Sequence, residues 1–116
     1  MSLLEQTIVR LLSEIRETAG VFASLPADQW VTVLGRCCEA TRDVRLFAAP
    51  PNAVDADLTT KIAVCFRTLL AKLEELDPDK ISNSDTREVF SDYVENIRFR
   101  TELFEDLAAG KQPAQA

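Results

Sequence analysis

Apolar side chains recur at helical spacing along almost the whole chain, most clearly between Asp85 and Leu107. Steps of three, four and seven residues separate the members of this stripe, which places them on one face of an α-helix and not on a strand. The stripe consists of Phe90, Tyr93, Ile97, Phe104 and Leu107. This stretch therefore predicts a long amphipathic helix, and the rest of the chain must supply the apolar surface that covers it.

Polar residues before this stretch and a glycine after it predict where the helix begins and ends. Side chains of the segment 82–85 accept hydrogen bonds from the free N–H groups of a helix start. Ser82 with Asp85, or Asp85 with Glu88, has the spacing of a capping box, and the sequence leaves both open. Gly110 can adopt the left-handed conformation that ends helices.

A first amphipathic helix is predicted at the start of the chain. Ser2 and Glu5 have the spacing of a capping box, so the helix is expected to begin at Ser2. Its apolar stripe extends as far as Leu25. Gly20 lies inside the pattern and is expected to bend this helix or to end it early, because glycine costs about 1 kcal/mol relative to alanine in a helix.

Prolines delimit the second and third predicted helices. Pro26 suits the first turn of a helix, so the second helix is expected to run from there to about Ala48, before a double proline. Asn52 and Asp55 have the spacing of a cap for the third helix, which is expected to end near Leu76.

The four segments have similar lengths and short connections, which favours antiparallel neighbours. We therefore predict an all-α fold, a four-helix bundle with up-down-up-down topology, as a single domain over residues 1–110. Residues 111–116 are predicted to form a flexible C-terminal tail. Phe66 and Leu70 widen the stripe of the third helix, which leaves one alternative open, a pair of helical hairpins that completes its core by dimerising.

Composition excludes several classes of partner. The net charge of −6 disfavours general nucleic-acid binding, which needs a basic surface. No stretch approaches the roughly 18 apolar residues of a membrane span, so no membrane partner is expected. The N-terminal residues lack a secretory pattern. Three cysteines form no disulfide framework, and we expect a cytoplasmic protein with reduced thiols.

Catalytic and metal-binding patterns are missing from the sequence. Without histidine, serine–histidine and cysteine–histidine nucleophile systems are excluded. Glu88, Asp92 and Glu95 share one helix face, but that face is opposite the apolar stripe and is expected to be solvated. We therefore predict no enzyme, no cofactor and no metal site.

One cysteine has basic neighbours in the sequence. Cys38 is expected at the flank of the second helix near Arg42 and Arg45, whose charges would lower the pKa of its thiol. No base or second thiol is placed to support a reactive role there. Cys37 and Cys65 are expected in the core as small apolar side chains.

An aromatic side chain on the polar face of the last helix is the exception to its pattern. Phe99 lies roughly 160° from Ile97 around the helix, and Leu103 lies between Phe99 and the core. Such residues extend the apolar stripe into an edge that a partner can cover. The predicted partner-binding residues are Phe99, Leu103, Asp92 and Asn96.

These features predict a non-enzymatic protein–protein interaction module, a small helical adaptor, regulator or complex subunit. The predicted partner is a protein, and a second copy of the chain is one option. The alternative is a helical bundle that binds or converts a small molecule in a pocket between helices. Polar groups near the core would then serve it, namely Cys37, Thr41, Tyr93 and Arg100.

Overall fold

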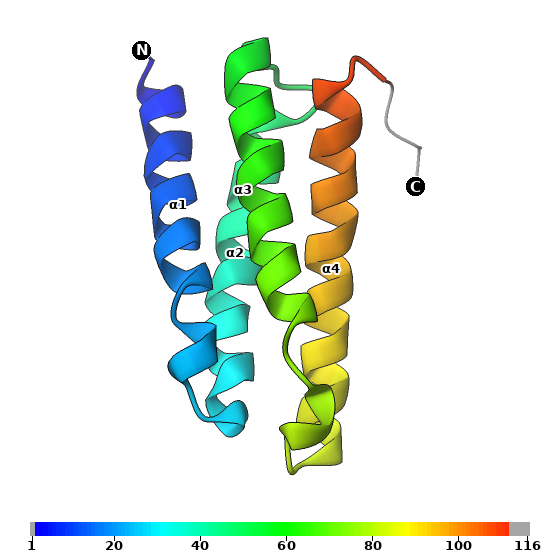
Figure 1. Cartoon of the computed structure of the whole chain (residues 1–116). Helices are drawn as coiled ribbons and strands as arrows, with labels where there is room; N and C mark the ends of the chain where they lie inside the picture. The colour runs from blue at the N-terminus through cyan, green and yellow to red at the C-terminus, as the bar shows by residue number, and fades with distance from the viewer. Residues whose placement is uncertain (1, 112–116) are drawn as a thin grey trace.

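The structure, a computed structural model, describes residues 2–111. Its four α-helices form a bundle (Figure 1), which confirms the predicted all-α four-helix fold. They are α1 (Leu3–Ala19), α2 (Trp30–Ala48), α3 (Ala56–Glu74) and α4 (Ser84–Ala108). Of the predicted tail, residues 112–116 lie outside the described residues.

The start of α1 follows its predicted cap. The Ser2 hydroxyl accepts from the Glu5 N–H at 3.1 Å and donates to the Glu5 carboxylate at 3.0 Å. The helix does not continue to Leu25, because it ends at Ala19 with Gly20 as its C-cap.

A short 3-10 turn, η1 (Phe22–Ser24), follows α1 and returns the chain to the core. The ring of Phe22 is buried, and the indole N–H of Trp30 is shared between the carbonyls of Phe22 and Leu25, at 3.2 Å each. Both carbonyls therefore bind a side chain of α2. Pro26 holds Leu25, the residue before it, in an extended conformation. Of the two outcomes expected at Gly20, the structure shows the early end of the helix, and the apolar stripe continues to Leu25 outside the α-helix.

The second and third helices are shorter than predicted at one end each. A second 3-10 turn, η2 (Ala27–Gln29), precedes α2, so the α-helix begins one turn after the predicted start at Pro26. Asp55 caps α3 by accepting from the Leu58 N–H at 2.8 Å. Asn52 takes no part in that cap, because its side-chain amide donates to the Leu46 carbonyl at 2.9 Å.

The N-cap of α4 is Asn83, which differs from both predicted alternatives. Its side chain accepts from the Thr86 N–H at 3.0 Å. Ser82 instead donates its N–H and hydroxyl to the Asp28 carboxylate, at 3.3 and 3.1 Å. These bonds join the connection before α4, which includes η3 (Pro78–Lys80), to the connection before α2.

The C-terminal end of α4 is the predicted one. Gly110 has a φ of +76°, which is the left-handed region. The Gly110 N–H donates to the Leu107 carbonyl at 3.1 Å, and the Lys111 N–H donates to the Asp106 carbonyl at 2.8 Å. This pair of bonds satisfies carbonyls that the helix end would leave without partners.

Successive helices run in opposite directions, but they are not all neighbours (Figure 1). Packing joins α1 to α2, α2 to α4, α4 to α3, and α3 to α1. Residue numbers increase on both α2 and α4 from one contact to the next, since Gly35 meets Tyr93 and Thr41 meets Arg100. The neighbours α2 and α4 are therefore parallel, although short connections had favoured antiparallel neighbours.

One apolar core lies between the four helices of a single chain. Its largest fully buried side chains come from every helix and include Ile15, Leu34, Phe66 and Phe104. The rings of Phe66 and Phe104 meet edge to face, with centroids 5.4 Å apart. Phe66 and Leu70 are both buried because α3 packs between α1 and α4. The wide stripe of the third helix is thus covered within the chain and needs no second copy.

Candidate interaction surface

The four predicted partner-binding residues lie along one stripe of α4. Asp92, Asn96, Phe99 and Leu103 follow one another at steps of four, three and four residues, which is one side of a helix. Asp92, Asn96 and Phe99 are exposed, whereas Leu103 is half-buried and packs against the core. Phe99 and Leu103 lie one turn apart on α4 and form the apolar part of this stripe.

Phe99 leaves 44% of its surface exposed although it is a large aromatic residue. The guanidinium group of Arg45 from α2 lies over its ring, with Cζ 5.5 Å from the ring centroid. Such a cation–π contact contributes about 0.5–1 kcal/mol at an exposed site. The contact holds the ring at the border of the two helices and leaves its outer part open to solvent.

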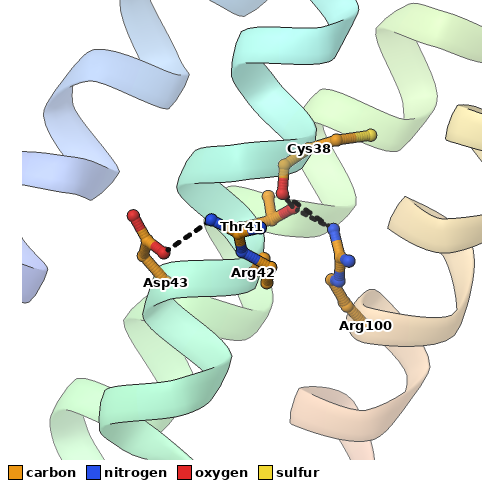
Figure 2. A network of polar contacts seen from close by, with 5 residues as sticks. All are labelled: Cys38, Thr41, Arg42, Asp43 and Arg100. Atoms are coloured by element: carbon orange, nitrogen blue, oxygen red, sulfur yellow. Dashed lines mark hydrogen bonds and ion pairs between the residues drawn. The ribbon is translucent and has the colours of Figure 1, made fainter.

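Arg100, the residue after Phe99, also joins α4 to α2 (Figure 2). Its Nη1 donates to the Cys38 carbonyl and to the Thr41 hydroxyl, at 2.9 Å each. Thr41 is fully buried, and its hydroxyl also donates to the Cys38 carbonyl at 3.2 Å. This network satisfies buried polar groups and sets the register of the two parallel helices.

Three arginines thus gather where α2 meets α4. Burial lowers the pKa of Arg100, Cys38 opposes this shift, and the positive charges of Arg45 and Arg42 lower the pKa further. Arg42 pairs with Asp43 at 3.5 Å, and Figure 2 shows Asp43 on the side of Arg42 away from Arg100. We call the surface formed by Arg42, Arg45, Phe99, Arg100 and Leu103 the α2/α4 edge.

Gly35 of α2 faces Tyr93 of α4 next to this edge. A Cβ atom added at Gly35 of α2 would meet the ring of Tyr93 of α4 at 3.6 Å. The Cys38 thiol lies near the Tyr93 carbonyl, with Sγ at 3.6 Å. Gly35 and Cys38 of α2 therefore both lie against Tyr93 of α4.

The polar groups that a small-molecule site would use do not form one pocket. Cys37 lines a hollow of about 250 Å³ between α1 and α2 that contains none of Thr41, Tyr93 and Arg100. Thr41 and Arg100 bind one another, and Tyr93 packs against Gly35. These groups hold the helices together.

The three thiols are buried and protonated at neutral pH. Burial raises the pKa of Cys37 to about 12, with further increases from Cys38 and Cys65. Burial also raises the pKa of Cys38 to about 11, although the Arg100 charge and its hydrogen bond oppose the shift. The expected lowering of the Cys38 pKa by Arg42 and Arg45 was therefore wrong, because desolvation of this thiol outweighs the nearby positive charge.

Asp92 also borders a second, acidic hollow near the start of α4. This hollow has a volume of about 530 Å³, and its wall includes Asp79, Asp85, Glu88 and Asp92. Within residues 2–111, no group of three or more histidine, cysteine, aspartate or glutamate side chains is placed to hold a metal ion. In the same part of the chain, no helix is both long enough and apolar enough to cross a membrane.

Sequence reasoning identified Phe99 and missed its contact with Arg45. The apolar pattern placed Phe99 away from the core, on the polar face of the last helix. It could not show that α2 and α4 are neighbours. A sequence signal was nevertheless present, since Arg42 and Arg45 form a basic pair on a chain that is acidic as a whole.

Comparison with known proteins adds no relative to these observations. No family model matches the chain, and neither a curated protein nor a solved structure matches it. Function is therefore argued from the surface itself, because a helical bundle hosts many unrelated functions.

Proposed function

We propose that this chain is a non-enzymatic protein–protein interaction module and that the α2/α4 edge is its binding surface. The observation that carries the proposal is the exposed Phe99 ring, which lies under the Arg45 guanidinium and beside the half-buried Leu103. Aromatic residues and arginine are enriched in protein interfaces, and they dominate their binding energy.

The positions of the polar groups near the core support a role in protein binding and not in catalysis. Arg100 and Thr41 are engaged in the contact between helices, and the three free cysteines are buried. Buried protonated thiols are poor nucleophiles. Free cysteines also suit a reducing compartment, so the proposal includes a cytoplasmic location.

Affinity capture with matched surface variants tests this function. The wild type, Phe99→Asp and Val64→Asp would each be immobilised and exposed to an extract of the source cells. Val64 is 61% exposed on α3 and provides the control, because its replacement adds the same charge on another helix. We expect proteins that bind the wild type and Val64→Asp but not Phe99→Asp.

Capture of the same proteins by Phe99→Asp would overturn the proposed surface. Leu103 is left unchanged in this test because it packs against the core, where a carboxylate would also disturb folding. Light scattering on the same three samples measures self-association. A wild-type dimer that becomes a monomer in Phe99→Asp would identify a second copy of the chain as the partner.

A further inference from the structure

We propose that the α2/α4 edge binds a protein segment in which carboxylates surround an apolar side chain. This inference rests on the proposed function and adds to it the chemistry of the partner. It follows from the charge around Phe99, from the positions of the neighbouring acidic residues and from the way in which Arg45 meets the ring.

Two of the three arginines of the edge carry positive charge that no carboxylate in the described part of the chain neutralises there, whereas Arg42 pairs with Asp43. Among residues 2–111, neither Arg45 nor Arg100 forms an ion pair with a carboxylate. The chain has 19 acidic side chains and a net charge of −6, so its arginines would meet acids often if these were evenly spread. The edge is thus a local basic surface on an acidic protein, and it attracts negative charge.

The acids that flank Phe99 in the sequence are turned to its other side. Glu95 pairs with Arg98, which also contacts Glu74 of α3 at 3.6 Å. The charge of Glu102 acts on Arg67, which lies on α3 as well. Phe99 therefore lies at a boundary, with the carboxylates of Glu95 and Glu102 toward α3 and guanidinium groups toward α2.

The Arg45 contact leaves hydrogen-bond donors for a carboxylate. Among residues 2–111, the guanidinium group of Arg45 has no hydrogen-bond or ion-pair partner besides its contact with the Phe99 ring, so its N–H groups remain available to a ligand. These N–H groups can bind a carboxylate in bidentate fashion. A partner that places an apolar side chain on Phe99 and Leu103 would bring a neighbouring carboxylate to Arg45.

A second copy of the chain is the weaker occupant for the same reason. In a two-fold symmetric dimer, each surface patch meets its own copy. Arg42, Arg45 and Arg100 would then face the same three arginines, and like charges across an interface are unfavourable. An acidic segment of another protein would contact these arginines without like-charge repulsion.

Selection from a display library of random linear peptides tests the inference. Peptides are selected on the wild type and counter-selected on Phe99→Ser, so that those retained bind through Phe99. Their affinities are then measured by fluorescence anisotropy for the wild type, Arg45→Glu and Arg10→Glu. Arg10 is exposed on α1 and serves as the control, because its replacement changes the net charge by the same amount.

We expect the selected peptides to be acidic with at least one large apolar residue. Arg45→Glu should weaken them by about tenfold or more, and Arg10→Glu by less than about twofold. Circular dichroism confirms that each variant is folded. If Arg45→Glu is not, Arg45→Gln makes the same test by removing the positive charge without adding a negative one.

The other outcomes separate this inference from the proposed function. Neutral or basic peptides that depend on Phe99 but not on Arg45 would overturn the inference and leave an interaction module. If no selected peptide depends on Phe99, both proposals fail. Equally tight, Arg45-dependent binding of single-stranded DNA would show general attraction of anions and would overturn the acidic-peptide assignment.

Discussion

Arg100 donates to the fully buried Thr41 hydroxyl at 2.9 Å, from one helix of a parallel pair to the other. Replacement of Thr41 by valine keeps the shape of the side chain and removes the acceptor. Hydrogen bonds to charged groups contribute about 1.5–3 kcal/mol, and Arg100 keeps its bond to the Cys38 carbonyl. We expect Thr41→Val to lower the free energy of unfolding by about 1–2 kcal/mol in urea titrations.

A double-mutant cycle shows whether this loss arises from the Arg100 contact. In an Arg100→Met background, Thr41→Val should cost much less, because the charged donor is already missing. Equal costs in both backgrounds would mean that Thr41 acts through packing alone.

Gly35 is a position where an alanine should stabilise the protein. Glycine in a helix interior costs about 0.8–1.0 kcal/mol relative to alanine. The added Cβ would meet the Tyr93 ring at 3.6 Å, an ordinary van der Waals distance. We expect Gly35→Ala to raise the free energy of unfolding by about 0.5–1 kcal/mol. A larger side chain such as valine should instead destabilise the protein, because it would displace Tyr93.

Gly110 provides the opposite case for the same substitution. Nothing lies within 4 Å of a Cβ added there, but the φ of +76° is unfavourable for a residue with a side chain. We expect Gly110→Ala to lower the free energy of unfolding by about 1 kcal/mol. A stabilising effect would show that the end of α4 can take another conformation at no cost.

Arg45 and Phe99 should be coupled in folding as well as in binding. Unfolding of the wild type, Arg45→Gln, Phe99→Leu and the double variant gives their interaction energy, which we expect to be about 0.5–1 kcal/mol. A parallel cycle of Arg42 with Phe99 is the control, because Arg42 is paired with Asp43. An interaction energy near zero between Arg45 and Phe99 would mean that the cation–π contact does not hold the ring in place.

The buried thiols make stability depend on pH above their ordinary pKa near 9.0. The pKa is raised to about 12 in Cys37 and to about 11 in Cys38 and Cys65. Below pH 9 both the folded and the unfolded chain keep these protons, so the full stability is present. As the pH rises from about 9 through 11–12, the unfolded chain loses protons that the folded chain retains.

We therefore expect the free energy of unfolding to fall over that range, with a limiting slope of about 1.4 kcal/mol per pH unit for each thiol. Urea titrations at several pH values measure the slope. Replacement of all three cysteines by alanine should flatten it whatever its effect on stability near neutral pH. An unchanged slope would assign the pH dependence to other groups.

The sequence predicted local features well, since these depend on residues close together in the chain. The Ser2 cap and the end at Gly110 each involve side chains or backbone within one helical turn. The Asn52–Asp55 cap predicted for the third helix was only half right, because Asp55 caps that helix without Asn52. The cap of α4 was missed because four successive residues can all act as caps, and a distant contact with Asp28 engages Ser82.

Relations between helices could not be predicted in the same way. An apolar stripe shows which side of a helix faces the core, but not which helix covers it. The pairing of Arg45 with Phe99 and the burial of Cys38 both depend on α2 lying beside α4. Phe99 itself was visible in the sequence, because a large aromatic residue on a polar face departs from the helical pattern.

The parallel placement of α2 and α4 also has a consequence for the order of folding. The pairs α1–α2 and α3–α4 are local hairpins, whereas α2 and α3 follow one another but lie diagonally across the bundle. Contacts such as Gly35 with Tyr93 close a long loop of chain, which slows folding relative to local contacts. We therefore expect two hairpins to form first and the core to close when they dock. The Arg45–Phe99 contact would then form only at that last step.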